Sequence, residues 1–199
     1  NYPEKQLEGV YWSLYVEFKF YIFSSFIYFL KGRTALVASL VIAFFIACTT
    51  RFLSIYFDSS FFLQLDEVIK LLSFRHFGWF AIGAAYYIYI KESKKEWMYF
   101  AILISIFCSL LPPNMTIGSA LGAFTICSIF GLSVSSQRVK EFLTNRLFLF
   151  FGYISYPFYL IHENALISGV IQLNKLFPFI PHFLLPFVML FILSLVAFF

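Results

Sequence analysis

Three polar side chains recur every four residues within an aromatic segment near the start of the chain. Residues 11–21 read YWSLYVEFKFY, and a helix would place Ser13, Glu17 and Tyr21 on one face. A carboxylate in so apolar a segment is costly unless it lines a polar cavity or forms an ion pair that fixes helix packing. Glu17 is therefore a candidate catalytic residue, with the packing ion pair as the alternative. Trp12, Ser13 and Tyr21 are candidate substrate-binding residues.

A second segment combines hydroxyl, imidazole and carboxyl side chains, and residues 151–164 read FGYISYPFYLIHEN. Helical spacing gives one face to four of its polar residues, Ser155, Tyr159, His162 and Glu163. Hydroxyl groups bind and polarise oxygen atoms, so Ser155, Tyr156 and Tyr159 are candidate substrate-binding residues. An imidazole exchanges protons near neutral pH, so His162 is a candidate catalytic base, with a hydrogen-bonded structural role as the alternative.

Basic side chains occur within or beside other apolar runs. Arg75 and His76 precede one such run, where they are candidate substrate-binding residues or interfacial anchors. Lys19 lies off the face that carries Glu17, and we expect it to pair structurally or to reach the membrane surface. The three cysteines fall inside apolar runs without metal-ligand spacing, so we expect packing residues and no metal site.

The composition indicates what kind of element must position these groups. Of 199 residues, 61% are hydrophobic, 23% aromatic and 12% charged, whereas about a quarter of a soluble domain is charged. This balance excludes an ordinary soluble domain, a disordered chain and a disulfide scaffold. The net charge of +4 is small, and Lys and Arg beside apolar segments set topology. We therefore expect membrane lipids, and not nucleic acid, as partners.

Seven apolar windows are long enough to cross a membrane as helices. They cover residues 10–30, 34–50, 71–90, 97–111, 115–134, 147–173 and 181–199. The sequence thus predicts an all-α fold, a polytopic membrane helical bundle that forms one domain over residues 1–199. The connection over residues 51–70 is the longest, and we expect a short interfacial helix in it. Pro157 removes a backbone donor from the sixth helix, which predicts a kink or a local opening.

The basic residues of the connections are divided unequally between the two sides of the membrane. Alternate connections carry eight Lys and Arg on one side and five on the other, which predicts Asn1 outside the cytoplasm and Phe199 inside. If the intact protein begins in the cytoplasm, an odd number of helices precedes this piece. At about 1.5 Å per residue, Glu17, His162 and Arg75 all fall in the outer half of the membrane. We therefore expect them to border one polar cavity.

Two of these segments resemble the signatures of a known family. Residues 12–21 resemble the W-S-L-x-x-E-x-x-F-Y signature of the acyltransferase 3 family, membrane-embedded enzymes that acylate sugars and other acceptors. Residues 152–162 resemble the family's G-x-I-S-Y-x-x-Y-L-x-H segment, in the same order and at about the same separation. Residues 75–83 resemble, less specifically, the phenylalanine-rich helix that such families have between the two signatures.

The resemblance implies a fold of ten helices, of which this sequence supplies seven. It implies acyl-CoA, with acetyl-CoA as the expected donor, reached from the cytoplasmic side, and no tightly bound cofactor. The implied acceptor is a glycan or lipid-linked sugar, such as lipopolysaccharide O-antigen or peptidoglycan, acylated outside the bacterial inner (cell) membrane. The family's first helix with its histidine is absent from this sequence, as are the arginine motifs that follow it. We therefore expect the piece to need those helices as its partner and to be inactive alone.

Acyl transfer from a thioester to a hydroxyl needs a base for the hydroxyl proton and donors for the developing oxyanion. The resemblance implies that Glu17 orients or charges the missing histidine, as carboxylates do in other acyl-transfer sites. It leaves Ser155, Tyr156 and Tyr159 to bind or polarise donor or acceptor, and His162 as a second base or a structural residue. The alternative class is a transporter or exporter of a glycan or small metabolite, whose polar cavity moves its substrate without covalent change.

Overall fold

The computed structural model describes residues 8–57, 59–112 and 116–198, without the side chains of residues 8–11, 163 and 164. No strand occurs in these residues and nearly all of them are helical, so the predicted all-α class is confirmed. Within the same residues, two helices are long and apolar enough to cross a membrane, as judged by length and composition. They are α1 (Glu8–Tyr56) and α5 (Ile117–Ser135).

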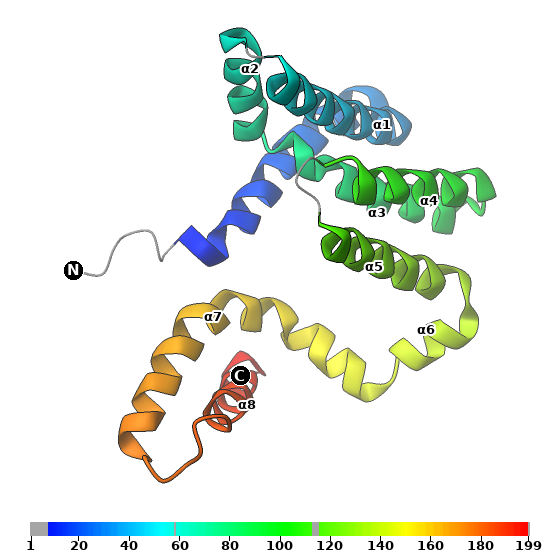
Figure 1. The fold of residues 1–199 in the computed structure, drawn as a ribbon. Coiled ribbons are helices and arrows are strands. Elements are labelled where there is room, and N and C mark those ends of the chain that lie inside the picture. Colours follow the sequence, from blue (N-terminus) through cyan, green and yellow to red (C-terminus); the bar gives the residue numbers. More distant parts are fainter. Residues whose placement is uncertain (1–7, 58, 113–115, 199) are drawn as a thin grey trace. The chain divides into compact units, whose positions relative to one another are not determined.

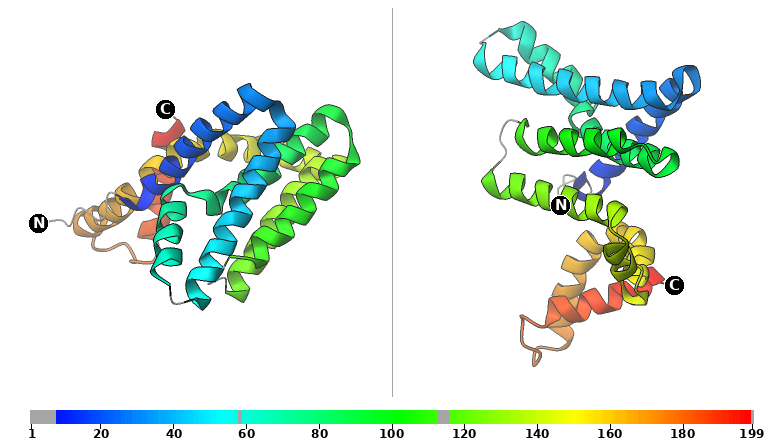
Figure 2. Two further views of the ribbon diagram at one scale, coloured as in Figure 1. Left: turned by 90° about the horizontal axis from the view of Figure 1, so that it is seen from above. Right: turned by 90° about the vertical axis from the view of Figure 1, so that its right-hand side faces the viewer.

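A single residue interrupts α1. Gly32 has φ +80° and ψ −176°, a backbone conformation that side-chain-bearing residues rarely adopt. The chain reverses there, and Figure 2 shows the two halves of α1 meeting in a V. The halves correspond to the first two predicted helices, and Gly32 lies in the short basic connection predicted between them.

The longest predicted connection does contain a short helix, α2 (Ser60–Leu71). A 3-10 turn, η2 (Phe74–His76), leads from it into α3 (Phe77–Glu92), so the third predicted helix begins later than expected. The reason is local, because Ser73 adopts a left-handed conformation with φ 61° that ends the helical path. The ammonium of Lys19 binds this turn through the Leu71 carbonyl and, at 3.1 Å, the Ser73 hydroxyl. Lys19 thus has the structural role predicted for it.

The remaining helices are α4 (Lys95–Leu110), α6 (Gln137–Leu143), α7 (Arg146–Leu176) and α8 (Leu185–Phe198). Helix α7 runs through Pro157 without a break, but Figure 1 shows it bent along its length. A proline inside a helix removes one backbone hydrogen bond and crowds the preceding turn, which accounts for a bend of this kind.

Contacts divide the chain into two compact units. We call Asn1–Leu14 with Glu141–Phe199 the terminal unit, and Tyr15–Lys140 the central unit. In the central unit α3 packs along α4, and α4 along α5 (Figure 1). Its buried core includes Phe44, Tyr86 and all three cysteines, which are free thiols and pack as predicted. In the terminal unit α7 packs along α8.

Candidate functional site

The terminal unit contains a cavity of about 530 Å³ between α7 and α8. The lining is mostly apolar, but three of the predicted site residues contribute polar groups to it. The lining residues are Phe151, Ile154, Ser155, Phe158, Tyr159, His162, Leu190 and Ser194. The helical spacing that predicted a shared face for Ser155, Tyr159 and His162 therefore brings all three to one cavity.

The geometry around His162 fixes which of its ring nitrogens carries a hydrogen. Nδ1 lies 2.7 Å from the backbone carbonyl oxygen of Tyr159. A carbonyl oxygen can only accept, so Nδ1 donates, and in the neutral imidazole the Nε2 atom then holds a lone pair. The ring of Phe158 stacks on the imidazole at 5.7 Å with an interplanar angle of 12°. His162 is thus oriented by its own helix as a hydrogen-bond or proton acceptor.

A hydrogen bond joins the start of α1 to this cavity. The Ser13 hydroxyl and the Tyr159 hydroxyl are 2.8 Å apart, and either can donate. The Tyr159 ring in turn lies 5.7 Å from the ring of His162, measured between centroids. Ser13 and Tyr159 are separated by 146 residues and come from the two segments with the most specific motifs. The structure therefore brings residues of both motifs into one polar contact.

Two further hydroxyls of the lining are satisfied by their own helices. Ser155 donates to the Gly152 carbonyl and Ser194 donates to the Leu190 carbonyl, each at 2.8 Å. A hydroxyl that donates to the backbone keeps lone pairs with which to accept. The described lining thus offers acceptors and an imidazole but no charged side chain, which suits a neutral ligand that carries a hydroxyl and an apolar part.

Other predicted site residues are not among those that line this cavity. Tyr156 is 56% exposed and Trp12 is 55% exposed, and neither lines this cavity. Tyr21 is 58% exposed and belongs to the central unit. Glu17 also belongs to the central unit, where it is half-buried on α1 and forms no ion pair with the described residues. The side chain of Glu163 lies outside the described residues.

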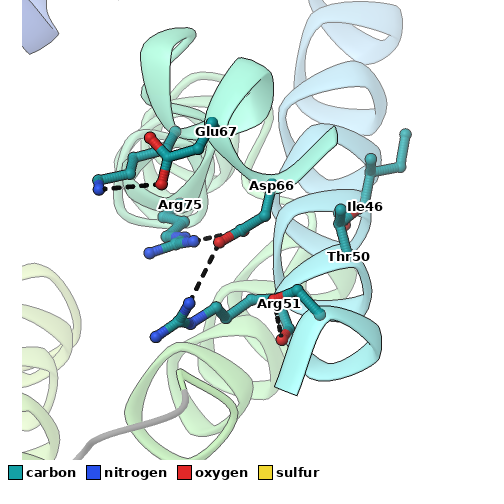
Figure 3. A network of polar contacts seen from close by, with 8 residues as sticks. Ile46, Thr50, Arg51, Asp66, Glu67 and Arg75 are labelled. Carbon is teal, nitrogen blue, oxygen red and sulfur yellow. Dashed lines mark hydrogen bonds and ion pairs between the residues drawn. The ribbon is translucent and has the colours of Figure 1, made fainter. Parts of the chain in front are cut away.

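Arg75 takes part in a charged network that sequence reasoning missed. Its Nη2 lies 2.5 Å from one oxygen of Asp66, and Nη1 of Arg51 lies 3.3 Å from the other (Figure 3). The Asp66 side chain is only 4% exposed. The sequence of the segment that forms α2 did contain an indication of this network. Helical spacing puts Asp66 on the same face as Ile69, and both residues are buried. A carboxylate on the buried face of such a helix needs a cationic partner.

His76 follows Arg75 in the turn before α3 and is half-buried. Burial lowers the pKa of its imidazole from the ordinary value, and the neighbouring charge of Arg75 lowers it further. Neutral His76 is therefore the form that the fold favours near pH 7. No group of three or more His, Cys, Asp or Glu side chains is arranged to hold a metal ion within the described part of the chain.

No family model matches this chain, and no curated protein and no solved structure is significantly similar to it.

Proposed function

We propose that this chain is part of an integral membrane O-acyltransferase that transfers an acyl group, in the first instance acetyl, from acyl-CoA to a hydroxyl of a glycan or another extracytoplasmic acceptor. The observation that carries the proposal is the hydrogen bond between Ser13 and Tyr159. Each residue belongs to a segment that resembles a signature of the acyltransferase 3 family. Two distant segments that contribute to one site are expected to meet, and the contact between Ser13 and Tyr159 supports the proposal in this way.

The chemistry required is the attack of an acceptor hydroxyl on the thioester carbonyl. The new ester C–O bond forms, the C–S bond breaks, and the hydroxyl proton passes by way of a base to the departing CoA thiolate. Nε2 of His162 holds the lone pair that such a base needs. The Tyr159 hydroxyl, when it donates, is of the type that stabilises a developing oxyanion. In the intact protein Glu17 orients the histidine of the preceding helices, which leaves His162 as a second base.

The remaining roles concern binding. The apolar lining from Phe151, Ile154 and Leu190 suits the acyl part of a donor or acceptor, and Ser155 accepts hydrogen bonds beside it. Trp12, Tyr21 and Tyr156 are exposed aromatic residues that suit contact with the acceptor sugar. Arg75 and His76 contribute to substrate binding in the central unit.

Exposed apolar side chains support a membrane protein, for which we propose seven crossings. On α5 and α8, Ile117, Ile126 and Phe191 are among many large side chains that water would surround in a soluble protein. In this proposal the two halves of α1 cross separately, followed by α3, α4, α5, α7 and α8, in the inner membrane of a bacterium. Reporter fusions after residues 32, 93 and 145 are expected to be cytoplasmic, and fusions after residues 59 and 180 extracytoplasmic.

The decisive experiment is the transfer of radiolabelled acetyl from acetyl-CoA to surface glycan by membranes that contain the intact parent protein. We compare the wild type with Glu17→Gln and His162→Gln, and with Glu67→Gln as a matched change at an exposed acid of the central unit. The label is expected in glycan with the wild type and Glu67→Gln. Glu17→Gln is expected to abolish transfer at an unchanged membrane level, and His162→Gln to reduce it.

Full transfer by Glu17→Gln would remove Glu17 from the mechanism. No label in any glycan, with acetyl-CoA and with longer acyl donors, would contradict the acyltransferase itself. In that case movement of unmodified glycan or metabolite across the membrane would identify the transporter, since a transporter changes only the location of its substrate.

A further inference from the structure

The charged network of the central unit is unbalanced. Asp66 bridges the two arginines, with one carboxylate oxygen on Nη2 of Arg75 and the other on Nη1 of Arg51. Three elements supply the three residues, since Arg51 lies on α1, Asp66 on α2 and Arg75 on η2 (Figure 3). One carboxylate neutralises one of the two permanent positive charges, so a net charge of about +1 remains at the network.

The hydrogen-bonding capacity of the two guanidinium groups is also largely unused. Each binds Asp66 through a single terminal nitrogen instead of the bidentate fork that arginine forms with a dedicated carboxylate. The Nε atoms of Arg51 and Arg75 are both buried, and neither has a hydrogen-bond partner among the described residues. Buried donors of this kind are normally satisfied, and a charged one is especially costly to leave unmade.

The described surroundings do not supply a second anion. Glu67, the neighbouring acid of α2, forms its ion pair with Lys70 at 3.4 Å, and both side chains are largely exposed to solvent. Thr50 and Ser54 lie close to Arg51 on α1, and their hydroxyls donate to carbonyls of that helix. A positively charged group with spare donors is therefore open to an anion from outside the described chain.

The position of the network favours an anion found at a membrane surface. Arg51 lies in the last turns of α1, close to where that helix ends at Tyr56. On α2 the buried face holds Asp66 and Ile69, whereas Phe61 and Val68 are more than half exposed. A short helix with an outward apolar face is typical of a helix that lies among lipid headgroups and the first acyl carbons. The arginines would then lie at the depth of phosphate groups.

We propose that Arg51 and Arg75, held together by Asp66, form a binding site for a phosphate group. Guanidinium groups match the tetrahedral oxygens of phosphate through paired N–H donors, which lysine cannot do. The phosphate comes either from a phospholipid headgroup or from a soluble phosphate-bearing molecule. The site holds whether or not the protein transfers acyl groups, because it rests on charge and geometry within the central unit alone.

The test is a thermal unfolding experiment on the purified full chain in an uncharged maltoside detergent after lipid removal. In one arm inorganic phosphate is added, with chloride at the same ionic strength as the control. In the second arm phosphatidylglycerol is added, with diacylglycerol of the same acyl chains as the control. The wild type is expected to be stabilised in at least one arm. Arg51→Gln is expected to bind the ligand more weakly and so to raise the half-saturating concentration by about tenfold, the usual effect of losing one charge-assisted contact. Arg33→Gln, which removes an arginine outside the network, is expected to leave it unchanged.

Stabilisation by inorganic phosphate assigns a soluble ligand, and stabilisation by phosphatidylglycerol alone assigns a lipid headgroup. The absence of stabilisation in both arms of the wild type overturns the proposal without any variant. Equal binding by Arg51→Gln and the wild type also overturns it. If Arg51→Gln does not fold, Arg51→Lys keeps the charge but not the paired donors, and unchanged phosphate binding by that variant counts against the site. A loss of acetyl transfer with intact phosphate binding would leave this inference standing and contradict only the proposed enzyme.

Discussion

The two polar regions of this protein are built on opposite principles. At the cavity between α7 and α8, His162 and Ser155 are satisfied within their own helix, by Tyr159 and Gly152, whereas the Tyr159 hydroxyl bonds to Ser13 of α1. In the central unit, Arg51 and Arg75 both depend on one carboxylate from another element. Local satisfaction leaves side chains available to a ligand at little cost to the fold. Where charges on different elements neutralise one another, the removal of any one of them is expected to destabilise the fold.

The two units also differ in how much apolar surface they bury. Within the described residues, two buried hydrophobic clusters lie in the central unit, one around Phe44 and Tyr86 and the other around Leu40 and Phe77. The described helices of the terminal unit bury few large side chains, and most of their apolar surface is exposed. Stability is therefore expected to reside mainly in the central unit, and ligand chemistry in the terminal unit.

The largest effect on stability is expected from Asp66→Asn. This change leaves two guanidinium groups without their shared counter-charge, and breaking a buried ion pair by removing one partner costs about 3–5 kcal/mol. The free energy of unfolding in detergent, measured by tryptophan fluorescence, is expected to fall by that amount. Glu67→Gln is the matched control, because its carboxylate is exposed and its pair with Lys70 is worth about 0–1 kcal/mol.

A loss of less than about 1 kcal/mol in Asp66→Asn would break the contrast between the two regions. It would mean that water hydrates the arginines as well as Asp66 does, so that the network does not tie the fold to its charges. A folded Asp66→Asn protein whose activity is lost would invert the contrast, because the network would then act in function more than in stability.

The helices and the local part of the cavity could be predicted from the sequence. Apolar windows located the helical segments to within a few residues in most cases, because length and hydrophobicity act locally. The shared lining by Ser155, Tyr159 and His162 follows from helical spacing alone. A bend in α7 is expected from the backbone donor that Pro157 lacks.

Contacts between distant segments could not be predicted in this way. Ser13 and Tyr159 are 146 residues apart, and nothing in either segment identifies the other as its partner. Asp66 and Arg75 form their ion pair across the turn at left-handed Ser73, and Lys19 of α1 donates a hydrogen bond to the hydroxyl of that serine. Boundaries shifted for the same reason, since α3 begins at Phe77 only because the chain turns at Ser73.

The contrast is sharpened by a double-mutant cycle across the contact between Ser13 and Tyr159. Ser13→Ala and Tyr159→Phe each remove one hydroxyl, and their coupling in the free energy of unfolding is expected to be about 0.6 kcal/mol, as for other hydrogen bonds between membrane helices. In the intact parent protein, acetyl transfer is expected to fall by more than this energy accounts for. Ser194→Ala, whose hydroxyl bonds its own helix, is expected to show no coupling with Tyr159→Phe. A coupling of several kcal/mol would instead assign the contact to the fold.

The smallest effect is expected at Glu92, which resembles Asp66 in bridging two basic residues. Its oxygens lie 2.6 Å from Nη2 of Arg33 and 2.8 Å from Nζ of Lys94, but these cations are 52% and 63% exposed, against about 30% for the arginines around Asp66. The hydrogen bond from Lys94 lowers the pKa of Glu92 from its usual 4.5 and outweighs the opposite effect of burial, and the charges of Arg33 and Lys94 lower the pKa further.

A lowered pKa in the folded state means that the stabilising contribution of Glu92 is present above its ordinary pKa and is lost as the pH falls through the folded value. Glu92→Gln is therefore expected to reduce the acid sensitivity of the melting temperature below about pH 4.5 and to change it little at pH 7. Added salt should shrink the difference further, because exposed charges are screened. A salt-independent loss at pH 7 as large as that of Asp66→Asn would show that bridging two cations, and not burial, determines what a carboxylate contributes here.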